Sequence, residues 1–149
     1  MDSNTINALK RLERVGSETS RATEKLYDAC IIVANAALDS IPCHEITEQS
    51  MADGYYYTGL PRGYTLHFAG CDRDVEYHLS WRKDPDNPCV DVNLNSREDE
   101  HEELGIRRNA ALHFARDVAT GWLDELAEWL EARTQKSEAA AAKLESSKF

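Results

Sequence analysis

Histidine is the side chain whose charge changes nearest neutral pH, and His67 and His78 each stand in a stretch of alternating polar and apolar residues. Residues 64–69, 75–82 and 90–95 all alternate in this way, so in a paired sheet their polar positions fall on one face. That face would carry His67, Glu76, His78, Ser80, Arg82, Asp91 and Asn93. Two histidines beside carboxylates can bind a metal or move protons, although polar side chains on an outward sheet face are the more usual interpretation. One alternative function is therefore a small enzyme or a ligand- or metal-binding protein.

Other signatures of catalysis are missing from the sequence. His44-Glu45 and His101-Glu102 both lack the second histidine of the zinc-peptidase motif H-E-x-x-H. The phosphate-binding patterns G-x-x-x-x-G-K-[ST] and G-x-G-x-x-G and the nucleophile motif G-x-S-x-G do not occur. The four cysteines are widely spaced with no C-x-x-C pair. We therefore expect a non-catalytic chain with no cofactor and no metal.

The stretch 54–64 combines tyrosines with an arginine between glycines. Tyr55, Tyr56 and Tyr57 precede Arg62, and Tyr64 follows it. Tyrosine offers a large contact area with a polar tip, and arginine offers a planar fork of donors, so this stretch is a candidate surface for recognising another protein. The alternative is a hairpin whose tyrosines pack on the edge of the core.

The net charge of −10 points to the class of partner. Eight acidic residues and a single base, Arg97, lie between positions 84 and 103; the acids are Asp84, Asp86, Asp91, Glu98, Asp99, Glu100, Glu102 and Glu103. Such a field repels phosphate backbones and favours basic proteins. We predict that Asp84, Asp86, Glu98, Asp99, Glu100, Glu102 and Glu103 bind a basic protein surface, such as that of a nucleic-acid-binding protein, without direct contact to nucleic acid. The other interpretations are solubility and, for Glu98 to Glu100, the start of a helix after Ser96.

A long helix is predicted at the N-terminus. Residues 3–41 contain no proline, and two rows of apolar or small residues repeat every seven positions, one through Leu12, Leu26 and Val33 and the other through Val15 and Ala29. Ser3 or Asn4 is the expected N-cap, and Pro42 ends the helix. Gly16-Ser17 is a potential break, but the seven-residue phase continues across it.

The fold class that follows is α+β: a long N-terminal helix, an antiparallel meander of four or five strands and a long C-terminal helix, with both helices on one sheet face. Besides the three alternating strands, residues 44–49 and 55–58 are weaker strand candidates. The apolar stripe from Ala111 to Leu130 predicts one C-terminal helix. We assign residues 1–136 to a single domain and residues 137–149 to an Ala-rich, frayed tail.

The length of the first helix raises the question of what covers it. Nearly forty residues span roughly 55 to 60 Å, whereas a domain of this size is about 30 to 40 Å across. We expect the two long helices to lie antiparallel, with their far halves zipped into a stalk or paired with a second copy. Burial of Leu9, Leu12 and Val15 is worth about 1.5 to 3 kcal/mol each. Pairing with a second copy would make the chain a homodimer through the first helix.

These features lead to one leading function and two alternatives. The leading prediction is a non-catalytic acidic protein-binding module that inhibits a nucleic-acid-handling complex, of the type that phages and mobile elements encode. A small dimeric chaperone or adaptor is the second prediction, and an enzyme or ligand-binding protein that uses the polar sheet face is the third. The mean hydropathy of −0.59 and the polar N-terminus favour a cytoplasmic location with no membrane contact.

Overall fold

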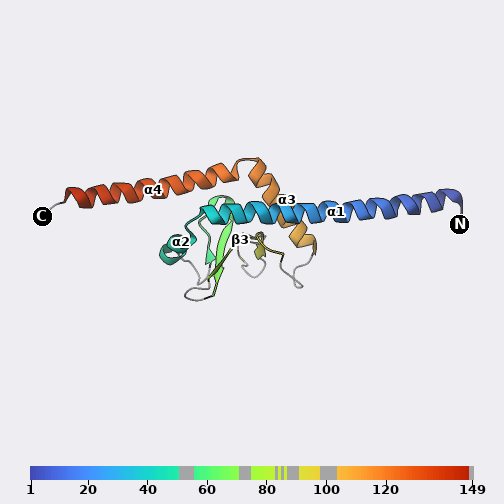
Figure 1. The fold of residues 1–149 in the computed structure, drawn as a ribbon, viewed down its shortest axis with the longest axis horizontal. Helices are drawn as coiled ribbons and strands as arrows, with labels where there is room; N and C mark the ends of the chain where they lie inside the picture. The colour runs from blue at the N-terminus through green and yellow to red at the C-terminus, as the bar shows by residue number, and fades with distance from the viewer. Residues whose placement is uncertain are drawn as a thin grey trace.

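The structure is a computed structural model, and it describes residues 1–50, 56–70, 75–82, 84, 86, 91–97 and 104–147. The elements follow in the order α1 (Ser3–Ser40), α2 (Cys43–Ser50), β1 (Tyr56–Tyr57), the short 3₁₀ helix η1 (Pro61–Gly63), β2 (Thr65–Ala69), β3 (Glu76–Arg82), β4 (Asp91–Asn93), α3 (Leu104–Ala119) and α4 (Trp122–Ser146). The four strands form one antiparallel sheet in the order β1-β2-β3-β4. The predicted α+β class with an antiparallel meander between long helices is confirmed (Figure 1).

The helix α1 is continuous through Gly16-Ser17, as the seven-residue phase predicts. Its N-cap is Asp2 rather than Ser3 or Asn4, because the Asp2 carboxylate accepts a hydrogen bond of 2.7 Å from the amide of Thr5. The helix ends at Ser40, and Ile41 before Pro42 is extended, as steric contact with the proline ring requires.

The register of the sheet confirms the predicted separation of its two faces. Leu66 pairs with Leu79 and Trp81 pairs with Val92, which places apolar side chains on the face that the helices cover. The core fills the space between this face and the helices. It includes Tyr27, Cys30, Ala34, Ala37 and Leu38 of α1; Tyr64, Leu66, Leu79 and Val92 of the sheet region; Ala110, Ala111 and Phe114 of α3; and Trp122 and Leu126 of α4.

One predicted strand is a helix. Residues 44–49 belong to α2, whose first turn forms when the amides of Glu45 and Ile46 donate to the carbonyl of Pro42. A proline suits the start of a helix because its ring presets the backbone and its missing amide proton is not needed there. Ile46 then points into the core and is fully buried. The other weak candidate, 55–58, is in part confirmed as β1; Tyr55 lies outside the described residues.

The predicted single C-terminal helix is interrupted. α3 ends at Ala119 and α4 begins at Trp122, with Gly121 between them at φ 104° and ψ 17°. This left-handed conformation is open to glycine and costly for other residues. α4 then remains helical to Ser146, and every side chain from Thr134 to Ser147 is exposed. The fraying of residues 137–149 stays a prediction.

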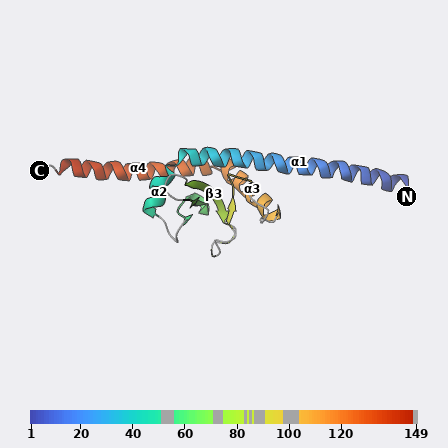
Figure 2. The same cartoon turned by 60° about the horizontal axis from the view of Figure 1, so that its bottom comes forward.

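The two long helices project from opposite ends of the molecule. In Figures 1 and 2 the N-terminal half of α1 extends beyond the sheet on one side, and the C-terminal half of α4 extends on the other. The prediction that their far halves lie antiparallel in a stalk is therefore wrong. All of residues 1–22 are exposed, and we call this segment the α1 arm. Among the described residues no helix has the length and apolar character that would let it cross a membrane.

Candidate protein-binding surfaces

The polar face of the sheet carries a stack of rings that runs across three strands. The ring of Tyr56 lies 4.6 Å from that of His67, which lies 5.8 Å from that of His78. His78 Nδ1 is 2.9 Å from the side-chain amide nitrogen of Asn93, and His78 Nε2 is 3.6 Å from a Glu76 carboxylate oxygen. The sequence correctly placed these residues on one face, and the structure adds the aromatic cover of Tyr56.

The rest of this face is buried and internally bonded. Arg82 makes a two-pronged contact with Asp91, with nitrogen–oxygen distances of 2.8 and 3.1 Å. Thr65, Ser80 and Asn93 are all buried. An ion pair in such a position needs both partners, because removal of one leaves an uncompensated charge. Arg82 and Asp91 thus serve the fold.

This arrangement gives little support to a metal-binding or catalytic face. The described residues contain no group of three or more metal-ligating side chains, whereas a structural or catalytic zinc needs at least three protein ligands. The two histidines pack against each other, and His67 packs against Tyr56.

Arg62, a predicted recognition residue, is the centre of an internal network that we call the Arg62 cluster. Its guanidinium donates to the Asp117 carboxylate at 3.0 Å, to the Thr120 carbonyl at 2.9 Å and to the Thr120 hydroxyl at 2.5 Å. It also donates to both carboxylate oxygens of Glu125, one of them at 3.1 Å. Arg62 itself has a left-handed backbone (φ 59°). These contacts fasten η1 to the junction between α3 and α4.

Tyr64 and Trp122 complete this junction from the core side. The Tyr64 hydroxyl donates to Asp117 Oδ2 at 2.6 Å, and the Trp122 ring nitrogen donates to the Pro61 carbonyl at 3.0 Å. Burial, and then the hydrogen bond to Asp117, raise the pKa of Tyr64 well above its ordinary value. No local pattern predicts this network, since Arg62 and Tyr64 lie more than fifty residues from Asp117 and only folding brings them together.

The predicted tyrosine surface is largely packed. Tyr56 covers His67, and the half-buried Tyr57 lies with its ring 5.9 Å from that of Trp129 on α4. Tyr55 is outside the described residues. Tyr57 packs on the edge of the core, as in the alternative interpretation, whereas Tyr56 lies on the polar face of the sheet.

The predicted acidic surface is only partly described. Asp84 and Asp86 are exposed, and the Asp84 carboxylate accepts a hydrogen bond of 3.0 Å from the amide of Asp86. Glu98, Asp99, Glu100, Glu102 and Glu103 lie outside the described residues. Asp84 and Asp86 remain available to a partner at the end of β3.

A second acidic surface, which the sequence reasoning missed, runs along α4. Four exposed acids stand at spacings of four, three and seven residues: Asp124, Glu128, Glu131 and Glu138. At 3.6 residues per turn they point within about 40° of a common direction. The buried Trp122 and Leu126 point the opposite way. We call these four residues the α4 acidic row; their helical spacing is the signal that could have revealed them.

Four arginines of the folded body make contacts within the chain. Arg62, Arg82 and Arg97 form ion pairs within the chain. Arg107 is buried, donates to the Asn93 carbonyl and lies 5.4 Å from the ring centre of Tyr27. Residues 26–149 contain twenty-three acids and twelve bases, so the field of the folded body is negative.

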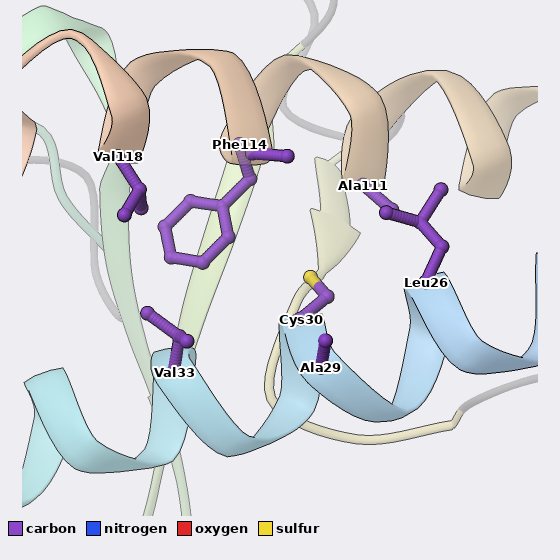
Figure 3. A pocket seen from close by; sticks show the side chains of 8 residues that line it. Leu26, Ala29, Cys30, Val33, Ala111, Phe114 and Val118 are labelled. Atoms are coloured by element: carbon purple, nitrogen blue, oxygen red, sulfur yellow. The ribbon is translucent and has the colours of Figure 1, made fainter.

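An apolar groove lies between α1 and α3 (Figure 3). It has a volume of about 210 Å³ and is lined by Leu26, Ala29, Cys30 and Val33 of α1 and by Ala111, Phe114, Ala115 and Val118 of α3. The figure shows these side chains pointing toward one another from the two helices. Burial raises the pKa of the Cys30 thiol to about 11, so this sulfur acts as a small apolar group in the groove wall. The groove suits an apolar side chain of a partner.

Comparisons of this chain with models of protein families, with curated protein sequences and with solved structures found no match.

Proposed function

We propose that this chain is a non-catalytic protein-binding module that docks on a basic protein surface through its acidic residues. The observation that carries the proposal is the asymmetry of charge in the folded body. Residues 26–149 contain twenty-three acids and twelve bases, and the α4 acidic row and Asp84 and Asp86 face solvent. Complementary charge steers association and selects the partner.

The geometry of the α4 acidic row supports the same function. Consecutive carboxylates of the row are three to seven residues apart on one helix face, which corresponds to about 5 to 10 Å along the axis. A basic groove that binds a nucleic-acid backbone presents Lys and Arg at the spacing of phosphates, which is of the same order. By occupying such a groove the module would inhibit a nucleic-acid-handling complex, the kind of system that phages and mobile elements encode.

The test uses a synthetic lysine-rich peptide as the basic probe and measures its affinity over a salt series. We expect E128Q/E131Q, which neutralises two acids of the row, to weaken binding about tenfold and to reduce the salt dependence. The matched control is D39N/E45Q, which makes the same change of charge at two exposed residues near the α1–α2 turn. The control should retain most of the affinity.

Equal losses in the two variants would mean that net charge alone acts, and the α4 acidic row would be refuted as a docking surface. A second measurement addresses inhibition: the chain should displace a fluorescent DNA duplex from a basic DNA-binding domain, and E128Q/E131Q should displace it less. Failure of the unmodified chain to displace DNA at any ratio would overturn the inhibitory function.

A further inference from the structure

We propose that the occupant of the α1–α3 groove is the α1 arm of a second copy of this chain, bound antiparallel. The inference does not depend on the basic partner, because it uses none of the residues assigned to that partner. It begins from the arm itself, whose side chains Ile6, Leu9, Leu12 and Val15 are 40 to 68% exposed. Four such apolar residues on one free helix are more than a solvated arm requires.

The apolar surface of the arm and the groove are two parts of one stripe. Leu12 lies two heptads before Leu26, and Val15 lies two heptads before Ala29. Positions seven residues apart share one side of a helix in a coiled coil. Since Leu26 and Ala29 line the groove, the same edge of α1 forms a wall of the groove beside α3 in its second half and stands free in its first half.

A two-fold axis near residues 20 and 21 places the α1 arm of one copy against the groove-forming half of α1 in the other copy. In this register Leu12 faces Ala29 of the second copy, Val15 faces Leu26, and Ala8 faces Val33. Two of these layers put a larger side chain against an alanine, which is the shape complementarity that an interdigitated helix pair needs. Leu12 thereby enters the groove where Ala29 leaves room, beside Phe114 and Ala115 of α3.

Charge favours the same register. Glu18 and Lys25 stand at equivalent flanking positions of consecutive heptads, and the antiparallel arrangement brings Glu18 of each copy beside Lys25 of the other. Two such pairs flank the axis. The arm and the residues that follow it carry no acidic excess, since residues 1–25 contain five bases and four acids. Self-association through an acidic surface would be repulsive, and through this segment it is not.

The test is the mass of the full chain by light scattering and sedimentation at about 50 μM. We expect twice the 16.8 kDa of one chain. L12E/V15E should shift the mass to that of one copy. Its far-UV circular dichroism spectrum should be unchanged, because both side chains are exposed in a single copy. The control L144E, at a leucine exposed on the far end of α4, should remain a dimer.

A charge swap tests the register. E18K and K25E should each weaken the dimer about tenfold or more by placing like charges together, and E18K/K25E should restore it. A wild-type chain that stays monomeric, or an L12E/V15E variant that stays dimeric, would overturn the proposal. Failure of the double charge swap to restore the dimer would overturn the antiparallel register. A monomer that nevertheless binds an isolated peptide of another sequence in the groove would also overturn it, since the second copy would not be the occupant.

Discussion

The break between α3 and α4 predicts a specific response to alanine at Gly121. Gly121 has φ 104°, and a methyl group added there would meet nothing within 4 Å. The cost of G121A is therefore one of backbone conformation and not of collision. A residue with a side chain loses about 1 to 2 kcal/mol in the left-handed region, and the stiffening of the unfolded chain by alanine returns only part of that.

We expect G121A to lower the free energy of unfolding by about 1 kcal/mol, which corresponds to roughly 2 to 4 °C in a chain of this size. The assay is urea unfolding followed by tryptophan fluorescence, since Trp122 is buried beside the substituted position. An increase in stability would refute the reasoning, because alanine stabilises a glycine position inside a continuous helix.

The control is the same substitution at Gly16 in α1, where an added methyl group also meets nothing within 4 Å. Gly16 lies within a regular helix, so alanine should favour the helix by about 0.8 to 1 kcal/mol. We expect G16A to raise helicity by circular dichroism without lowering the unfolding midpoint. A matching loss of stability in both variants would show that the left-handed conformation of Gly121 is not the cause.

Three further predictions concern buried groups. Y64F removes the hydroxyl that donates to Asp117 and should lower the free energy of unfolding in urea by about 1.5 to 3 kcal/mol. Since the folded pKa of Tyr64 is raised above 10.0, its contribution to stability is complete below pH 10 and is lost as pH rises beyond it. The alkaline loss of stability should therefore be smaller in Y64F, and an identical pH dependence would contradict this. R82M should cost about 3 to 5 kcal/mol because it removes the guanidinium that balances the Asp91 carboxylate and leaves the Thr65 hydroxyl as its neutral donor. R82M/D91L should recover part of the loss, and no recovery would mean that the pair is not the source of the effect. Burial raises the pKa of the Cys30 and Cys43 thiols to about 11. Both should therefore react with maleimide at pH 7.5 about a hundredfold more slowly than an exposed thiol, as measured by peptide mass spectrometry. Labelling within minutes in the folded chain would contradict their burial.

Periodicity was sufficient to predict the larger elements. The seven-residue rows of α1 and the stop at Pro42 define a helix without reference to the rest of the fold, and the alternation around Leu66 and Leu79 defines both the strands and the face that each side chain joins. These signals are local and repeated, so they tolerate errors at single positions.

The errors arose where the signal was short or lay elsewhere in the chain. Residues 44–49 are too few to distinguish a strand from a helix by their pattern, and Ile46 satisfies the core from either. A lone glycine is often tolerated within a helix, so Gly121 did not by itself predict a break. What fixes the break is Arg62, which binds the Thr120 carbonyl from 58 residues away, and no local pattern encodes that contact.

The candidate surfaces were predicted unevenly for related reasons. The acidic composition is plain in the sequence, but the acids of the α4 acidic row are spaced along a helix and stand out less than the dense run after Asp84. Arg62 was singled out for its chemistry, and its chemistry proved to be used internally. A count of charges does not reveal which arginines face solvent.

The opposed helical projections also govern how the molecule moves. The α1 arm adds about 33 Å on one side, and the exposed end of α4 from Thr134 adds about 20 Å on the other. An elongated molecule of this kind rotates quickly about its long axis and slowly end over end, and its frictional coefficient is larger than that of a sphere of equal mass. The rotational diffusion of one copy is therefore strongly anisotropic, so fluorescence depolarisation of a label on either projecting helix reports slow end-over-end rotation.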